Sequence, residues 1–278
     1  MVVRALFALT VFYGVPAFAD NWQEYSPEGT ICARGDDFSF FVSEGDPNKV
    51  VIDFIGGGAC WNANGCSREN PTFSDTIEPV LEFRRNGLKG AYNKEKAENP
   101  LKDWTHIVIP YCTGDIHWGD GDKTYTKANG ESFTIHHRGA RNANVVLNWV
   151  EDHYTAPNQM LVTGCSAGAY GSIYWTPHVA ERFPNSRIKQ FADSGAGVIT
   201  EEFFLNDFQK WNPTEFAPHW VPDLDPENND WRRLSLDQMY TRLGRFYPDI
   251  SFSQFNYRED VVQKIFYMLM GGDVLAWP

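Results

Sequence analysis

Short and nearly continuous apolar runs recur along the chain, separated by longer polar or mixed segments. Val, Ile, Leu and Phe fill these runs without the alternation of a half-exposed strand, which predicts strands covered on both faces. The runs span residues 49–55, 105–112, 159–164, 187–195 and 252–257.

Helices are predicted between these strands. Ala143, Val146, Val150 and Tyr154 recur at spacings of three and four, as on one face of an amphipathic helix. A second helix is predicted after residue 166, and Pro184 ends it. Alternation of strand and helix predicts an α/β fold with a mostly parallel sheet, whose ligands gather at the carboxyl ends of the strands.

The organisation of the chain is predicted to be simple. Residues 20–278 are expected to form a single domain. Residues 200–250 mix aromatic residues, prolines and acids, so they form either a helical cap over the site or a long crossover to the next strand.

The first residues are typical of a secretory signal peptide. One charge, Arg4, is followed by an apolar stretch and the small-residue ending Ala17-Phe18-Ala19, which predicts residues 1–19 as the cleaved segment. The apolar run is shorter than the ~20 residues of a membrane span, so an anchor is less favoured. We expect a secreted protein, extracellular or periplasmic, that is free of the membrane after cleavage.

The net charge and the cysteines indicate which partners are disfavoured and which disulfides could form. The formal net charge is −12 among 278 residues, which disfavours binding to nucleic acid or to anionic lipid. Export would expose the five cysteines to oxidising conditions. Cys60 and Cys66 are close enough to close a small loop, and Cys112 could pair with Cys165 if their strands are neighbours, which would leave Cys32 over.

The segment Gly164-Cys-Ser-Ala-Gly168 joins a predicted strand to a predicted helix. Glycines two residues before and after a serine remove the Cβ atoms that would clash in so tight a turn, and the turn exposes the hydroxyl. Ser166 is therefore predicted to be a nucleophile; the alternative is an ordinary glycine-flanked bend.

Three glycines at 56–58 end the first strong strand. Such a loop can aim backbone N–H groups at a developing oxyanion, and we expect Gly58, Ala59 and Ala167 to supply them. A phosphate loop is disfavoured because no Gly-Lys-Ser/Thr follows, and a plain glycine turn is the other alternative.

Five blocks together resemble the pectin acetylesterase/Notum family of secreted carboxylesterases. They are "GGGACWNANGC", "YCTGDIHWGD", "HHRGARN", "GCSAGAYGS" and "DSGAG", in family order, within residues 28–272. The resemblance implies an α/β-hydrolase-like fold with helices on both faces of the sheet, a Ser-Asp-His triad and no cofactor. It implies removal of an acyl group, which is acetate from pectin in plant and microbial members and palmitoleate from a signalling protein in animals.

The resemblance carries Ser166 over as nucleophile and Gly58, Ala59 and Ala167 as oxyanion donors. It places the acid in an Asp-x-x-Gln segment, here Asp260 to Gln263. Asp193 is the competing acid because it also ends a strand after the serine, and a helix N-cap is the alternative role of Asp260.

A base is missing from the pattern. The triad needs a His after the acid, and no His follows Asp260. Either the chain is a C-terminally truncated fragment whose base lies beyond Pro278, or a local His has taken over, or the protein is an inactive relative. Among the local candidates, His117 is the best placed; the full set is His106, His117, His136, His137, His153, His178 and His219.

Several loop residues are candidates for substrate binding, and no metal is expected. Aromatic and polar residues of the predicted strand-end loops are expected to contact substrate, namely Trp61, Asp115, His117 and Trp118. Asp115, Asp120 and Asp122 lack the terminal Glu of a calcium loop, and His136-His137 lacks a zinc pattern.

The sequence thus predicts a secreted serine carboxylesterase that acts on an acylated polysaccharide, such as acetylated pectin, or on another ester. The alternative is a secreted carbohydrate-binding protein without catalysis.

Overall fold

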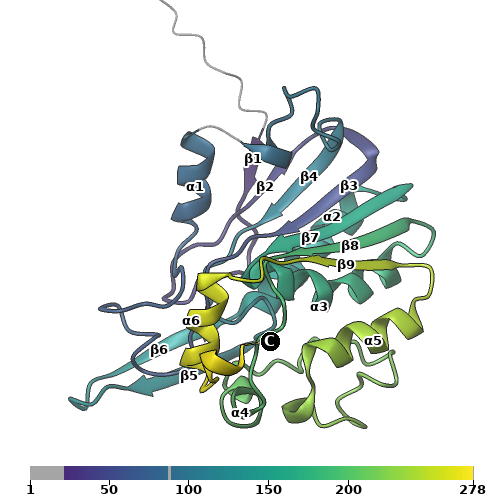
Figure 1. Ribbon diagram of the computed structural model, residues 1–278. Helices are drawn as coiled ribbons and strands as arrows, with labels where there is room; N and C mark the ends of the chain where they lie inside the picture. Colours follow the sequence, from purple (N-terminus) through teal and green to yellow (C-terminus); the bar gives the residue numbers. More distant parts are fainter. Residues whose placement is uncertain (1–21, 87–88, 278) are drawn as a thin grey trace, which may run out of the picture.

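The computed structural model describes residues 22–86 and 89–277, so the predicted signal peptide at 1–19 lies outside the described residues. A seven-stranded sheet in the order β1-β2-β4-β3-β7-β8-β9 forms its centre (Figure 1). The strands are β1 (Trp22–Tyr25), β2 (Phe40–Ser43), β3 (Asp46–Phe54), β4 (Trp104–Ile109), β7 (Gln159–Cys165), β8 (Arg187–Asp193) and β9 (Ser251–Phe255).

The sheet is mostly parallel. β4, β3, β7, β8 and β9 pair in parallel, whereas β1 pairs with β2, and β2 with β4, in antiparallel fashion. The five parallel strands are the five that the apolar runs predict, and each shares most of its residues with the predicted range. The strands β1 and β2 are short and were not predicted.

Helices cover both faces of the sheet, as expected. The helices α2 (Gly139–His153) and α3 (Ala167–Arg182) lie on one face, and α1 (Glu78–Arg85) lies on the other, over β1, β2 and β4 (Figure 1). The predicted stripe of α2 is buried in the main core. The α/β fold with a parallel sheet is therefore confirmed.

The segment between β8 and β9 contains α4 (Glu201–Asn206), two 3₁₀ turns (Phe208–Trp211 and Trp231–Arg233) and α5 (Leu236–Phe246). The connection packs through buried aromatic rings, and α5 contacts α3 and β9. The hairpin of β5 (Gly121–Thr126) and β6 (Ser132–His137) projects from the body below α6 (Val261–Leu269; Figure 1). Within the described ranges, no helix combines the length and apolarity needed to cross a membrane.

Two disulfides join Cys32 to Cys112 and Cys60 to Cys66. The second confirms the predicted small loop. The expected Cys112–Cys165 pair is wrong, because β3 lies between β4, which Cys112 follows, and β7, which Cys165 ends. Cys165 is free and exposed.

Three histidines are buried as neutral residues. Burial lowers the pKa of His117 and His137 to about 4 and that of His178 to about 3. Each donates a ring N–H to a backbone carbonyl, of Ile55, Thr113 and Phe216 respectively. Burial also raises the pKa of Asp115 to about 6, which favours the protonated acid in the folded protein.

The free energy of unfolding is expected to fall as the pH decreases from about 6.5 to about 4. In that range the unfolded chain protonates imidazoles that the folded chain keeps neutral, which costs about 3 kcal/mol for a single fully buried group. The raised pKa of Asp115 acts in the opposite direction between about pH 4 and 6, but three imidazoles outweigh one carboxyl. Urea unfolding at pH 7 and 4.5 measures the loss. His137→Gln should weaken the pH dependence, whereas the exposed His153→Gln should not; an unchanged slope in His137→Gln would contradict this account.

Candidate active site

Ser166 lies in a strained turn between β7 and α3. Its backbone has φ +56° and ψ −122°, a combination outside the main allowed regions that costs about 1–3 kcal/mol. Its N–H donates to the carbonyl of Asp193 on β8, and its carbonyl accepts from the amide of Ala169, both at 2.9 Å. Neighbouring elements therefore fix the turn on both sides.

The glycines of the motif allow this turn to pack against β3. A Cβ atom on Gly168 would lie 1.8 Å from the carbonyl oxygen of Phe54, and one on Gly164 would lie 2.2 Å from that of Gly168. A Cβ on Gly56 would come within 2.9 Å of the Ser166 Cβ. Only glycine fits these positions, because the backbones of β3, β7 and α3 approach one another too closely there for any side chain.

Two cavities meet at Ser166. One has a volume of about 50 Å³ and is walled by apolar side chains of α4, α6 and the glycine loop; the other has about 720 Å³ and runs along the sheet face beside α1. Of the described residues that line them, Ser166 alone belongs to both.

The expected oxyanion loop faces the small cavity. Gly58, with φ +75°, lines it together with Ala59 and Ala167. Ala167 is the first residue of α3, where an amide has no intrahelical partner and the helix dipole favours negative charge.

Ala59 is a correction to the expected donors. Its N–H donates to the carbonyl of Thr72 at 3.2 Å, and the Thr72 hydroxyl donates back to the Ala59 carbonyl at 2.7 Å. The pairing of this loop with residues 72–73 thus occupies the Ala59 amide, while Gly58 and Ala167 remain beside Ser166 in the cavity wall.

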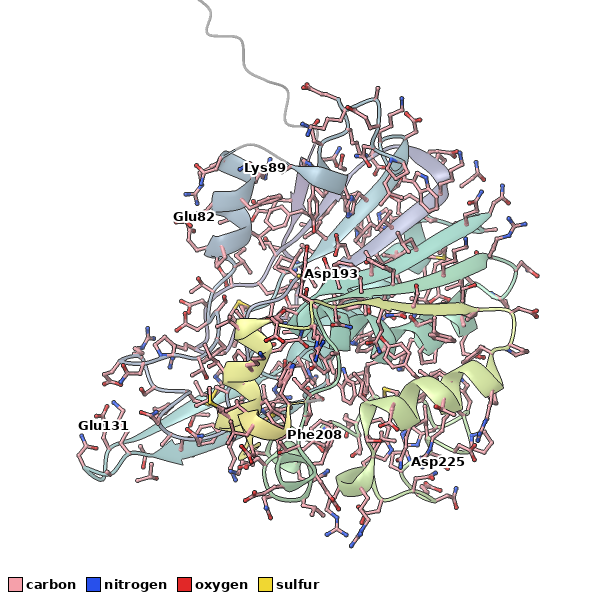
Figure 2. The ribbon with its side chains drawn as sticks, viewed as in Figure 1. Glu82, Lys89, Glu131, Asp193, Phe208 and Asp225 are labelled. Carbon is pink, nitrogen blue, oxygen red and sulfur yellow. A yellow bond between two sulfur atoms is a disulfide. The ribbon has the colours of Figure 1, made fainter. Side chains whose placement is uncertain are left out.

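One candidate acid, Asp193, ends β8, and the other, Asp260, follows the neighbouring strand β9 at the start of α6. Asp193 ends β8 close to the start of α6 (Figure 2), and its carboxylate accepts from the Ser194 hydroxyl at 2.8 Å. Asp260 caps α6 by accepting from the backbone N–H of Gln263 at 3.0 Å and from its side-chain amide at 3.1 Å. The side-chain oxygen of Gln263, Oε1, in turn accepts from the backbone N–H of Ala196 at 2.9 Å. Asp260 is therefore an N-cap and is also tied to the loop that follows β8.

All seven histidines lie in the described part of the chain, and none has a hydrogen bond to Ser166 there. His117 is 2% exposed, donates from Nε2 to Ile55 and lines neither cavity, so its expected role as substitute base or substrate contact is wrong. His106 lines the large cavity but pairs with Asp53 at 3.0 Å. His106 lies level with Val51 on β3 and, through it, with Leu161 on β7. Leu161 is five residues before Ser166, or roughly 16 Å along the strand.

Two further expected contacts are also buried. The Asp115 carboxylate accepts from Gly139 N–H and the Thr113 hydroxyl, both at 2.7 Å, and Trp118 donates to the carbonyl of Tyr170. Neither residue lines a cavity that contains Ser166, so both support the loop from within the core. Trp61, in contrast, does line the small cavity.

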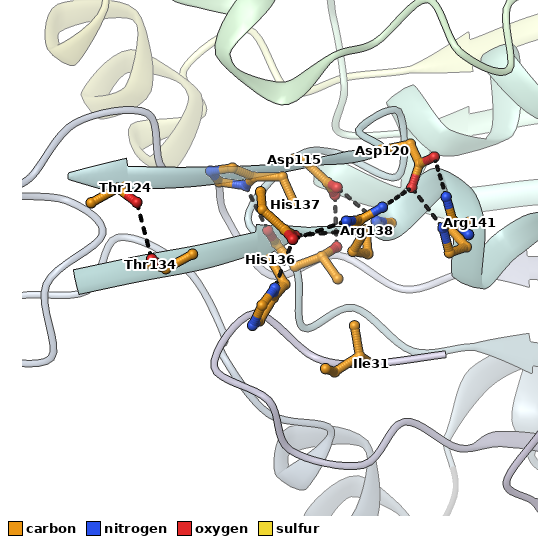
Figure 3. Close-up of polar contacts among 12 residues, drawn as sticks. Ile31, Asp115, Asp120, Thr124, Thr134, His136, His137, Arg138 and Arg141 are labelled. Carbon is orange, nitrogen blue, oxygen red and sulfur yellow. Dashed lines mark hydrogen bonds and ion pairs between the residues drawn. The ribbon is translucent and has the colours of Figure 1, made fainter. Parts of the chain in front are cut away.

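Two other acidic residues, Asp120 and Asp122, are paired with arginines (Figure 3). Asp120 accepts from Arg141 at 2.8 and 2.9 Å and from Arg138 at 3.0 Å. Asp122 pairs with Arg138 and His136. This network joins the β5–β6 hairpin to the start of α2.

The fold and the turn at Ser166 are those of an α/β-hydrolase. A profile of the Pectinacetylesterase family matches residues 22–218. The chain belongs to this family of carboxylesterases.

Individual relatives agree with that assignment. The chain is 27% identical over 162 residues to the palmitoleoyl-protein carboxylesterase NOTUM of Schmidtea mediterranea; the match covers 57% of this chain and 29% of the planarian protein. Two crystal forms of the Wnt deacylase Notum from Drosophila superpose with TM-scores of 0.59 and 0.53 at 15% identity, covering 90% of this chain and 79% of that one. The structural likeness supports the fold.

Gly168→Ala is expected to destabilise the protein by more than about 3 kcal/mol, because the added Cβ overlaps the Phe54 carbonyl and forces α3 away from β3. Gly244→Ala in α5 is the matched control. A Cβ there meets nothing within 4 Å, so that variant should gain about 0.5–1 kcal/mol. Equilibrium unfolding in urea compares them, and equal stabilities would contradict the packing argument.

Proposed function

We propose that the chain is the catalytic part of a secreted serine carboxylesterase that removes acyl groups, acetyl above all, from a polysaccharide such as pectin. The observation that carries the proposal is the position of Ser166, in a strained β-to-α turn where two cavities meet and where Gly58 and Ala167 line the small cavity with it. Membership of the Pectinacetylesterase family supports the class of ester.

The reaction follows acyl transfer through a covalent intermediate. Ser166 Oγ attacks the ester carbonyl carbon, its proton passes through a base to the leaving alcohol, and the C–O bond to that alcohol breaks. Water, which gives its proton to the same base, then attacks the acyl-enzyme carbonyl carbon; the bond to Ser166 Oγ breaks, the carboxylic acid leaves, and Oγ takes the proton back from the base. The N–H groups of Gly58 and Ala167 stabilise the oxyanion in both steps, and such a donor contributes about 3 kcal/mol.

The general base is proposed to be an imidazole from polypeptide outside residues 22–277. None of the described histidines forms a hydrogen bond with Ser166, and the match to the planarian relative covers only 29% of that protein. Asp260 is the proposed acid that orients this base, because its tie through Gln263 to Ala196 fixes it beside the loop that follows β8. Asp193 is the second candidate.

Secretion rests on the predicted signal peptide and is supported by the two disulfides, which persist in oxidising compartments. The alternative function is a secreted carbohydrate-binding protein without catalysis. A missing base favours it, whereas the strained serine turn favours the enzyme, since strain of this kind clusters at active sites.

Ser166→Ala in the complete gene product should abolish hydrolysis of p-nitrophenyl acetate, with kcat at least about 10⁴-fold lower. Ser132→Ala, an exposed position on the hairpin, is the control and should retain full activity. Unfolding midpoints of both variants establish that each is folded. Activity retained in folded Ser166→Ala would remove the nucleophile from the proposal.

Residues 20–278 alone should be nearly inactive beside the complete gene product, because a nucleophile without its imidazole loses most of the contribution of the triad. The comparison measures kcat for p-nitrophenyl acetate on both proteins after equal folding is verified by circular dichroism. Ordinary esterase turnover by residues 20–278 would show that a residue within this chain is the base. Inactivity of both proteins would favour the binding protein.

A further inference from the structure

The small cavity has room for very little beyond the reacting carbonyl. Its volume is about 50 Å³, whereas an apolar cavity of about 150 Å³ accommodates benzene, with six carbon atoms. By that proportion roughly two carbon atoms fit. Gly58 and Ala167, whose amides are the proposed oxyanion donors, line this cavity and not the large one, so the proposed function places the acyl carbon atoms here.

Helix α6 closes the cavity opposite the glycine loop. A Cβ built on Gly58 would lie 3.2 Å from Cζ of Phe266, so the tip of this ring stands directly against the loop. The centroid of the Phe266 ring is also 6.4 Å from that of the Trp61 ring, and both residues line the cavity.

The position of α6 is fixed at both ends. Near its start, the Gln263 side chain accepts from the Ala196 amide at 2.9 Å; at its end, the Met270 carbonyl accepts from the Thr200 hydroxyl at 2.6 Å. Both partners belong to the segment after β8. Because both ends of α6 are held by hydrogen bonds, the helix does not move aside easily to admit a longer acyl chain.

We propose that Phe266 is a specificity-determining residue that limits the acyl group to acetyl by filling the end of the small cavity. This inference rests on the proposed function. The large cavity, about 720 Å³, lies on the other side of Ser166 and has room for the alcohol portion of the ester.

The test measures kcat/KM of the complete protein for p-nitrophenyl acetate, butyrate and hexanoate. Each methylene beyond the cavity costs about 10-fold or more, so the wild type should prefer acetate to butyrate, which has two more methylenes, by at least about 100-fold, and to hexanoate by more than that. Phe266→Ala should reduce that preference at least about 10-fold, chiefly by a gain on hexanoate.

Ile265→Ala is the matched control, because Ile265 is the preceding residue of α6, is 45% exposed and lines neither cavity. Its preference should equal that of the wild type. Phe266→Leu, which keeps more of the packing, provides a second reading if the alanine variant does not fold, and it should shift the preference in the same direction.

The outcomes separate this inference from the proposed function. If wild type hydrolyses acetate through Ser166 but both Phe266 variants keep its preference, the inference is overturned and the esterase stands. Wild-type hydrolysis of hexanoate as fast as acetate would also overturn it, since the acyl chain would then enter the large cavity. If no ester is hydrolysed, the proposed function fails and the inference with it.

Discussion

The contact of α3 with β3 is the constraint on which the site depends. Gly168 rests against the carbonyl of Phe54, and Gly56, two residues further along the same strand end, lies against the Cβ of Ser166. This single approach of two backbones forces Ser166 to a positive φ and brings it beside the glycine loop. The proposed nucleophile and the proposed oxyanion donors are therefore positioned by one packing contact, and the burial of α3, which is almost entirely enclosed, offsets the strain in the turn.

The sequence predicted those parts of the fold that depend on residues close together in the chain. The inner strands β3 and β4 are buried over most of their apolar runs, as their sequences predict, and a glycine motif marks the turn after β7. The expectation of cover on both faces is wrong for β8, in which exposed and buried residues alternate, and for β9, which is largely exposed. The strands β1 and β2 are only four residues long, and the hairpin of β5 and β6 is largely polar, so neither carries a clear pattern. The Cys32–Cys112 bond depends on strand order, which spacing in the sequence does not encode.

The same distinction applies to where the structure places the predicted site residues. Ser166, Gly58 and Ala167 belong to motifs whose geometry follows from neighbouring residues, and the structure brings them to one cavity. The occupied amide of Ala59 depends on Thr72, thirteen residues away, and the burial of His117 depends on the whole of α3 packing over its loop. A polar residue in a strand-end loop has two uses, contact with a ligand and support of the loop, and sequence alone does not separate them.

Helix α6 connects two properties of the proposed enzyme that are usually set by different elements. Asp260 caps its first turn, and Phe266, two turns later, forms the wall of the small cavity. Any tilt of α6 therefore changes both the orientation of the acid and the depth of the cavity. Ala196 and Thr200, which hydrogen-bond to α6, belong to the segment that follows β8. The last residue of β8, Asp193, accepts the hydrogen bond from the Ser166 N–H. Nucleophile, acid and cavity wall thus share one support at the end of β8. A relative that accepts longer acyl groups can then keep its catalytic geometry by changing the side chain at the position of Phe266, because moving the helix would displace the acid as well.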